Sequence, residues 1–247
     1  MNKKASQGFT LIEIAIVLVI IGLLLGGVLK GQELITSARV RNLISQQDGI
    51  KAAFFGFQDR YRALPGDYAN ASANIKCPAV CLNGDGNGQI SATGAGGAGA
   101  TTHEDLLVWT HLTSAGFLNG AYNMVAADTT AADTNSPKNP YSVYLSLSYD
   151  STWGITGNTI SKHNLKTGAQ IPIEILAEVD RKVDDGQPFG GAFQFSAYQG
   201  NAAAAPTVGG ATACSYTAGG TTPGTGIATD VWAVTGGQTN CGASSLF

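Results

Sequence analysis

The sequence predicts an α+β protein in which a long N-terminal helix is followed by a globular domain with an antiparallel sheet. Three observations favour this class. Residues 9–29 form an almost uninterrupted apolar run. An apolar stripe with helical spacing then continues to Tyr61. Beyond that stripe, alternating apolar residues typical of strands occur between segments with helical signals.

The apolar run is long enough to cross a membrane. At 1.5 Å per residue, residues 9–29 span about 30 Å, the thickness of the hydrocarbon core. A secretory signal has a shorter apolar core and then a small-residue cleavage site, which does not follow here. Lys3 and Lys4 precede the run. The positive-inside rule therefore places the N-terminus in the cytoplasm and the rest of the chain outside.

Glu13 lies about one helical turn inside the apolar run. An unpaired carboxylate at membrane depth costs a few kcal/mol or more, so such acids usually have partners. An acid this close to a helix end can instead lie at the interface and reach headgroup water. The sequence around Glu13 favours a partner.

Residues 8–13, Gly-Phe-Thr-Leu-Ile-Glu, resemble the processing motif of type IV prepilins and type II secretion pseudopilins. The basic leader, glycine, phenylalanine, acid and apolar helix occur in the order of that family. The resemblance implies that a prepilin peptidase cuts after Gly8 and that the new amine of Phe9 is methylated. It also implies that Glu13 meets the terminal amine of a neighbouring subunit, which removes two unpaired charges from a helix bundle.

The helix is expected to continue as an amphipathic segment over residues 30–62. Residues 64–67, Leu-Pro-Gly-Asp, end it, because proline disfavours helix in the residue before it and glycine permits a turn. An apolar stripe recurs at three-, four- and seven-residue spacings: Leu43, Ile50, Phe54, Phe57 and Tyr61. The stripe would pack under a globular domain, as in pilins. A free coiled coil is the weaker alternative, since the heptad pattern is short.

The expected organisation is a cleaved leader (1–8), a helix (9–62) that is transmembrane over 9–29, and a globular pilin-like domain (63–247). Some 180 residues are enough to bury a core as one domain. Four further segments resemble a group of large prepilin-like proteins, which favours one domain over a fusion: residues 64–67, 83–88, 115–116 and 184–188.

Patterns within the globular part predict its elements. Residues 102–115 predict a helix capped by Thr102, and residues 172–183 predict another that starts at a proline. Strands are predicted over residues 141–149 and 193–197. Residues 91–101 are rich in glycine and alanine and predict a loop.

Composition favours an exported, loop-rich domain. The formal charge is −3, and loss of the two leader lysines gives −5. No basic patch indicates a nucleic-acid partner. The four cysteines form two sequence-local pairs, Cys77/Cys81 and Cys214/Cys241. For an exported chain we expect two disulfides with these local pairs among the three possible connectivities. A zinc site is the alternative, but the three histidines show no ligand spacing with the cysteines.

Residues 83–90, Asn-Gly-Asp-Gly-Asn-Gly-Gln-Ile, resemble the first part of a calcium loop. Oxygens of Asn83, Asp85, Asn87 and Gln89 are the candidate ligands. The twelfth loop position is Gly94, where a calcium loop has a bidentate glutamate. An ordinary Asn/Gly turn is therefore the main alternative.

Asp85 alone carries charge in that loop, so calcium would need further carboxylates from elsewhere. The candidates fall into two sets. One set is Glu104 and Asp105. The other is Asp180, Asp184 and Asp185.

The predicted function is that of a structural subunit of a type IV pilus-like or type II secretion pseudopilus filament, with no enzymatic role and no cofactor except the candidate calcium. No nucleophile elbow, His-Glu-x-x-His or phosphate loop is present. The expected partners are copies of itself or related pilins, prepilin peptidase, the inner-membrane assembly machinery and the membrane. The expected location is the bacterial inner membrane with a periplasmic domain, then a filament. The alternatives are a minor adhesive tip pilin and an anchored binding module that does not polymerise.

Overall fold

The computed structural model describes residues 10–78, 81–91, 103–154, 158–200, 211–217, 229–236 and 239–247, without the side chains of 211, 212 and 236. Its first element is α1 (Leu11–Tyr61), a helix of 51 residues. The chain divides into two compact units, residues 1–39 and 40–247. Helix α1 therefore contributes to both units. It ends where the Leu-Pro-Gly-Asp turn predicts.

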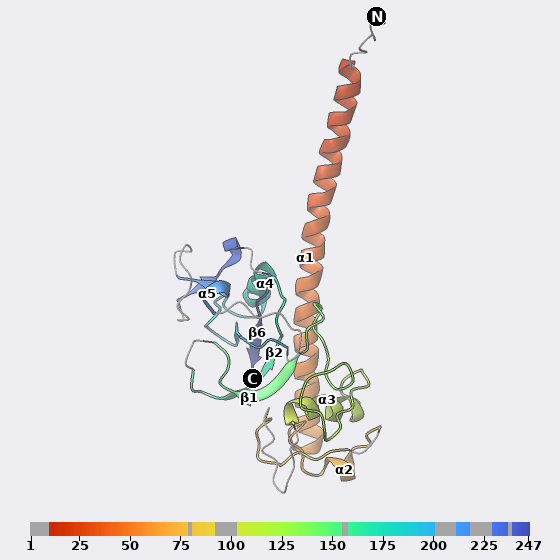
Figure 1. The fold of residues 1–247 in the computed structure, drawn as a ribbon, viewed down its shortest axis with the longest axis vertical. Coiled ribbons are helices and arrows are strands. Elements are labelled where there is room, and N and C mark those ends of the chain that lie inside the picture. Colours follow the sequence, from red (N-terminus) through yellow and green to blue (C-terminus); the bar gives the residue numbers. More distant parts are fainter. Residues whose placement is uncertain are drawn as a thin grey trace, which may run out of the picture. The chain divides into compact units, whose positions relative to one another are not determined.

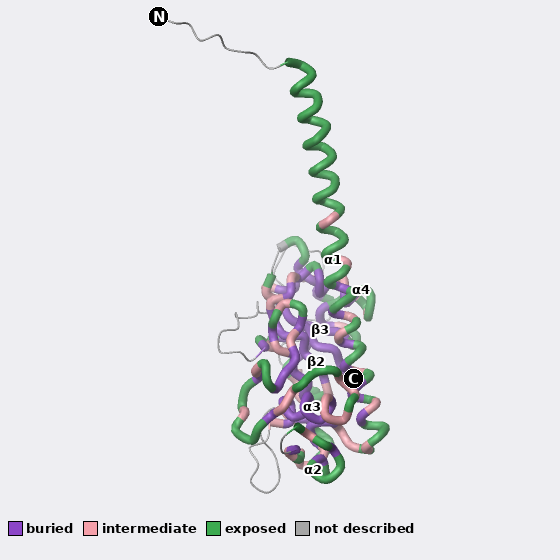
Figure 2. The backbone as a smooth tube through the Cα atoms, turned by 90° about the vertical axis from the view of Figure 1, so that its right-hand side faces the viewer, coloured by how far each residue is buried: buried purple, intermediate pink, exposed green. Residues whose placement is uncertain are grey.

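The part of α1 in the first unit is exposed along almost its whole length (Figure 2). It is the one helix in the described chain that is long and apolar enough to cross a membrane, by length and composition. None of the side chains of its most apolar stretch is buried within the protein. This agrees with the predicted membrane-length segment.

In the second unit, the remainder of α1 buries one stripe against the domain. The predicted stripe is confirmed at Leu43, Ile50, Phe54 and Phe57, and Tyr61 is partly buried. Val40 and Leu43 belong to one core cluster, with residues of α4 (Ile173–Val183) and β3 (Phe193–Phe195). The buried residues from Ile50 onward belong to another, with residues of α3 (Glu104–Ser114), β1 (Ser146–Asp150) and β2 (Lys162–Lys166). The helix thus supports two cores in succession.

The main sheet is antiparallel and has the strand order β1-β2-β6-β3. Figure 1 labels three of its strands, β1, β2 and β6. Leu147 pairs with Leu165, and both lie in the core that contains the buried residues of α1 from Ile50 onward. The bounds of its strands are β1 Ser146–Asp150, β2 Lys162–Lys166, β3 Phe193–Phe195 and β6 Ala243–Leu246. The α+β class predicted from the sequence is confirmed.

Two helices cover this sheet, and both were predicted. The first is α3 (Glu104–Ser114) and the second is α4 (Ile173–Val183). Thr102, the predicted cap of α3, lies outside the described residues, and the N-cap position is occupied by His103, whose side chain makes no capping bond. Instead, Ser91 O accepts the N–H groups of Glu104 and Asp105. A contact distant in sequence therefore satisfies these helix-start donors.

Smaller elements complete the described fold. They are α2 (Ala71–Asn74), α5 (Ala211–Cys214), a 3₁₀ turn (Val234–Gly236), and a two-stranded sheet of β4 (Ser215–Tyr216) and β5 (Val231–Trp232). The structure places both cysteine pairs at disulfide distance, with Cα–Cα separations of 5.2 Å for Cys77–Cys81 and 6.0 Å for Cys214–Cys241. The pairing is the sequence-local one.

One face of the main sheet is polar and still buried. Lys166 of β2 is 4% exposed and forms an ion pair with Asp150 of β1. The hydroxyl of Ser244 donates to Asn164 Oδ1 at 2.8 Å. These contacts satisfy polar groups that would otherwise be costly to bury.

Candidate functional site

The N-terminal processing residues Gly8 and Phe9 lie outside the described residues. Glu13 is described, in the first turn of α1. Its Oε2 accepts the backbone N–H and the hydroxyl of Thr10, both at 2.7 Å, while Thr10 Oγ1 accepts the N–H of Glu13 at 3.3 Å. This reciprocal pair is a capping box. The exposed carboxylate of Glu13 therefore stabilises the start of its own helix.

At the other end of α1, three segments meet because two glycines allow close approach. A Cβ on Gly84 would overlap the backbone of Asp67, and the N–H of Gly84 donates to Tyr68 O at 3.1 Å. Gly66 has φ +91°, and a Cβ there would lie 2.6 Å from Glu104 O. The turn after α1, the loop at 83–88 and the start of α3 are thereby held together.

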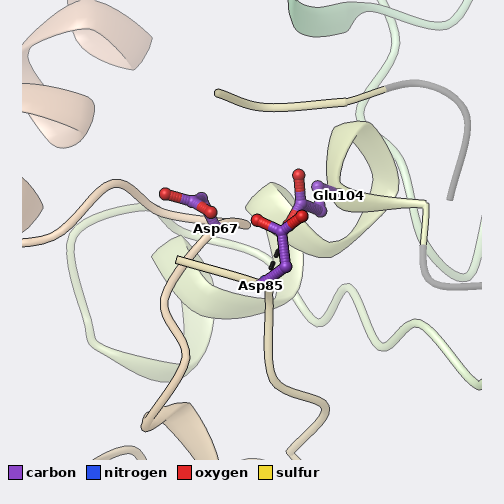
Figure 3. Close-up of side chains that lie close together, drawn as sticks. All are labelled: Asp67, Asp85 and Glu104. Carbon is purple, nitrogen blue, oxygen red and sulfur yellow. Dashed lines mark hydrogen bonds between the residues drawn. The ribbon is translucent and has the colours of Figure 1, made fainter. Parts of the chain in front are cut away.

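The acidic loop cluster, defined as Asp67, Asp85 and Glu104, lies at this meeting point (Figure 3). Carboxylate oxygens of the three residues come within 4.8 Å of one another. Each of the six carboxylate oxygens accepts at least one N–H. The donors are the N–H groups of Asn87 and Gly88 to Asp67, of Asp85 and Ser91 to Glu104, and the backbone and side-chain N–H of Asn87 to Asp85, at 2.7–3.0 Å.

Crowding of these carboxylates perturbs their protonation. Burial, and to a smaller extent the neighbouring Asp85 and Asp67 carboxylates, raise the pKa of Glu104 to about 7. Burial raises the pKa of Asp67 to about 6, against the opposing effect of its backbone N–H donors. Burial is the larger cause in both cases because it disfavours the charged form. The site therefore favours uptake of a positive charge, either a proton or a cation.

His111 of α3 holds two of these segments together through hydrogen bonds. The residue is fully buried on α3, its Nδ1 accepts the N–H of Gly66 at 2.9 Å, and its Nε2 lies 3.0 Å from Leu82 O. These partners assign the proton to Nε2 of a neutral ring. Burial lowers the pKa of His111 to about 4. The neutral side chain of His111 therefore links the turn after α1 to Leu82, which directly precedes the loop at 83–88.

The predicted loop ligands have varied surroundings. Asn83 Oδ1 accepts the N–H of Ser72 at 2.8 Å, and Asn87 Oδ1 accepts the N–H of Gln89 at 2.7 Å. The side chain of Gln89 is exposed. Of the four loop residues, Asp85 is the one that joins the carboxylate cluster.

The structure also sorts the predicted additional acids. Glu104 joins Asp85, whereas the neighbouring Asp105 lies with its Oδ1 3.6 Å from His103 Nδ1. Asp184 and Asp185 gather with Asp180 in a separate group. Of the additional acids that the sequence suggested, Glu104 is therefore the one that lies at the loop.

Asp67 was missed as a site residue, because residues 64–67 were interpreted as a helix terminator. Its carboxylate reaches the loop through hydrogen bonds to residues twenty and twenty-one positions later in the chain. A signal was available, since residues 64–67 and 83–88 both belong to the wider resemblance to large prepilin-like proteins.

The acidic loop cluster fits a calcium ion chemically. Calcium prefers carboxylate and carbonyl oxygens, and three carboxylates converge here. Each carboxylate has about four lone-pair sites, so the N–H donors leave further acceptor capacity. No ion pair among the described residues involves Asp67, Asp85 or Glu104. A bound cation would supply the missing positive charge.

Comparison with known proteins gives one match. Residues 3–29 match the family model described as the prokaryotic N-terminal methylation motif. No curated protein and no solved structure matches the chain. The matched segment contains Gly8, Phe9 and Glu13 and runs into the exposed apolar part of α1. The chain therefore carries the prokaryotic N-terminal methylation motif at the start of a long helix, which supports the resemblance to type IV prepilins and pseudopilins.

Proposed function

We propose that the chain is a structural subunit of a type IV pilus-like or type II secretion pseudopilus filament. The observation that carries the proposal is the methylation motif at residues 3–29, which leads into a helix whose apolar side chains are uncovered. Exposed apolar surface costs about 25 cal/mol per Å² in water. Lipid would cover this helix before assembly, and neighbouring helices would cover it in the filament.

The proposed sequence of events starts at the inner membrane. Prepilin peptidase removes residues 1–8 and the amine of Phe9 is methylated. The globular domain faces the periplasm while the helix stays in the membrane. The assembly machinery then adds the subunit to copies of itself or to related pilins. The matched family is one of structural subunits, so no catalytic role is proposed.

Glu13 carries the assembly step in this proposal. Its capping bonds to Thr10 leave it exposed, where the terminal amine of a neighbouring subunit can approach. The ammonium and carboxylate would neutralise each other in the filament, where water is scarce.

The test compares Glu13→Gln with Glu33→Gln in the native host. Glu33 lies on the same helix and pairs with Lys30 at 2.7 Å, so it is a matched exposed acid. Both variants should reach the membrane fraction at wild-type levels. Glu13→Gln should abolish filaments, whereas Glu33→Gln should retain them. Normal filaments from Glu13→Gln would refute the role of the charge.

The same filaments discriminate among the alternatives. Immunolabelling along the whole filament supports a major subunit, and labelling confined to one end supports a minor adhesive tip pilin. Absence from filaments, with the protein retained in the membrane, supports an anchored binding module.

We also propose that the acidic loop cluster binds calcium. The convergence of Asp67, Asp85 and Glu104 from three segments supports this, since one ion would join all three. Binding to the folded state alone stabilises it by about 2.7 kcal/mol at a hundredfold excess over Kd.

Calcium titration against the melting temperature of the full chain in detergent tests the proposal. The wild type should be stabilised, and the same calcium concentration should stabilise Asp85→Asn clearly less. Glu174→Gln, a change at an exposed acid of α4, should behave as the wild type. A flat wild-type response up to millimolar calcium would leave residues 83–88 as an ordinary turn.

A further inference from the structure

A second acidic group lies at the end of α4 and shares no residue with the acidic loop cluster. We define the acidic turn as Asp180, Asp184 and Asp185. Asp180 lies in the last turn of α4, and Asp184 and Asp185 are the two residues that follow Val183. Carboxylate oxygens of the three residues come within 4.8 Å of one another. None of the three belongs to the acidic loop cluster.

Asp180 is the buried member of this group. The residue is 0% exposed, and its Oδ2 accepts the indole N–H of Trp232 at 2.6 Å. Its Oδ1 is buried and accepts no hydrogen bond of normal geometry within the described chain. Burial raises the pKa of the Asp180 carboxyl to about 7, and the indole N–H of Trp232 and the backbone N–H of Gly186 oppose this rise. A buried carboxylate oxygen without a partner costs free energy unless a positive charge compensates it. This orphaned oxygen points to a ligand that the protein itself does not supply.

Asp184 and Asp185 shape the turn that surrounds Asp180. Asp184 Oδ2 accepts the N–H groups of Ala192 and Phe193, the latter at 2.8 Å. Asp185 Oδ1 accepts the N–H of Gln187 at 2.8 Å. Asp184 Oδ1 and Asp185 Oδ2 are not used in these bonds.

Two glycines, at positions 190 and 191, bring the backbone against the same carboxylates. A Cβ on Gly190 would overlap Asp185 Oδ2, and a Cβ on Gly191 would overlap the carboxylate of Asp184. The backbone at residues 190–191 therefore lies so close to these two carboxylates that a residue with a side chain would not fit there.

The neighbouring bases are engaged elsewhere. Arg181 and Lys182 both pair with Glu178, at 3.6 and 2.7 Å. Lys51 of α1 interacts electrostatically with Asp184, but no described ion pair joins a base to any member of the acidic turn. Three carboxylates therefore share this turn without a paired base.

We propose that the acidic turn binds a divalent cation of the calcium type, separately from the acidic loop cluster. A hard cation matches a ligand set of carboxylate oxygens, and it would give Asp180 Oδ1 its missing partner. The ion would tie the end of α4 to the chain entering β3. Through Trp232 it would also stabilise the small sheet of β4 and β5, which begins directly after the disulfide-bonded Cys214. This proposal is independent of filament assembly.

Trp232 provides a direct spectroscopic test on the full chain in detergent. Terbium is used as a probe for calcium sites, and excitation of a tryptophan a few ångströms away sensitises its luminescence. Because Trp232 donates to Asp180, a terbium ion in the acidic turn should give a strong signal that calcium displaces. Trp232→Phe should remove that signal.

Matched variants assign the signal to one cluster. Asp180→Asn should weaken terbium binding at this site by about tenfold or more, since a charged ligand is lost. Asp85→Asn, the same change in the acidic loop cluster, should leave the Trp232-dependent signal unchanged. Asp185→Asn alters an exposed ligand and should also weaken binding, so the test survives if Asp180→Asn does not fold. Far-ultraviolet circular dichroism identifies variants that are folded.

Several results would overturn the proposal. One is a folded wild type without Trp232-dependent luminescence. Another is equal terbium affinity in the wild type and in folded Asp180→Asn and Asp185→Asn. A third is a signal lost in Asp85→Asn alone, which would place the cation only at the acidic loop cluster.

Discussion

Glu104→Gln should change how the stability of the calcium-free protein depends on pH. The pKa of Glu104 is raised from 4.5 to about 7 in the folded state. Between these values the folded state binds more protons than the unfolded state, so stability rises as the pH falls. The stabilisation is absent above pH 7 and complete below pH 4.5. Glutamine has a similar shape but cannot titrate, so this contribution disappears.

The magnitude follows from the two pKa values. Between pH 8 and pH 5.5, proton uptake by Glu104 contributes about 2 kcal/mol to the free energy of unfolding. For a domain of this size that corresponds to a melting temperature about 4–8 °C higher at pH 5.5 than at pH 8. Calcium should raise the melting temperature at pH 8 by a similar amount, because a bound cation neutralises the same carboxylates as the proton.

The assay is thermal unfolding of the full chain in detergent, with a chelator present, at both pH values. For each protein, the melting temperature at pH 8 is subtracted from that at pH 5.5. The wild-type difference is then compared with that of Glu104→Gln. This comparison removes contributions from other titrating groups. Glu174→Gln, at an exposed position, should keep the wild-type change. An unchanged pH dependence in Glu104→Gln would refute the argument that burial and crowding raise its pKa.

Three further predictions concern the same domain. The pKa of His111 is lowered to about 4, so its contribution to stability falls as the pH drops from about 6.5 to 4, by up to about 3 kcal/mol; His111→Gln should abolish that acid sensitivity in denaturant titrations. Gly84→Ala should place a methyl group against the backbone of Asp67 and weaken calcium-dependent stabilisation, and a wild-type calcium response in this variant would contradict the close approach. Peptide mapping without reductant should recover Cys214 linked to Cys241, and replacing both by alanine should lower stability by about 3–4 kcal/mol; cross-pairing to the other two cysteines would contradict the assignment.

The elements that could be predicted from sequence are those whose burial follows a simple apolar period. The stripe from Leu43 to Phe57 predicted the packed half of α1, and Phe193 and Phe195 predicted β3. Strands β2 and β6 were not predicted, because Lys-His-Asn-Leu-Lys and Ala-Ser-Ser-Leu bury polar groups in cross-strand contacts. Only the three-dimensional pairing shows that these polar side chains have partners.

The acidic loop cluster was predicted in part for a similar reason. Asp85 could be predicted because it lies in a loop with alternating oxygen side chains, and Glu104 because it lies at a recognisable helix start. Asp67 reaches them through backbone donors and through the space that Gly84 leaves. Such a contact depends on the absence of a side chain, and a single sequence does not indicate which other segment uses that space.

The position of β6 within the main sheet affects the order in which the domain can form. Residues 243–246 insert between β2 and β3, which come much earlier in the chain. Until those late residues pair with them, β2 and β3 each have an unpaired edge, and such edges favour pairing with other chains. Long-range strand pairing also slows folding. Completion of the sheet therefore has to wait until residue 246 has been synthesised and can pair, and the incomplete domain exposes two strand edges in that interval.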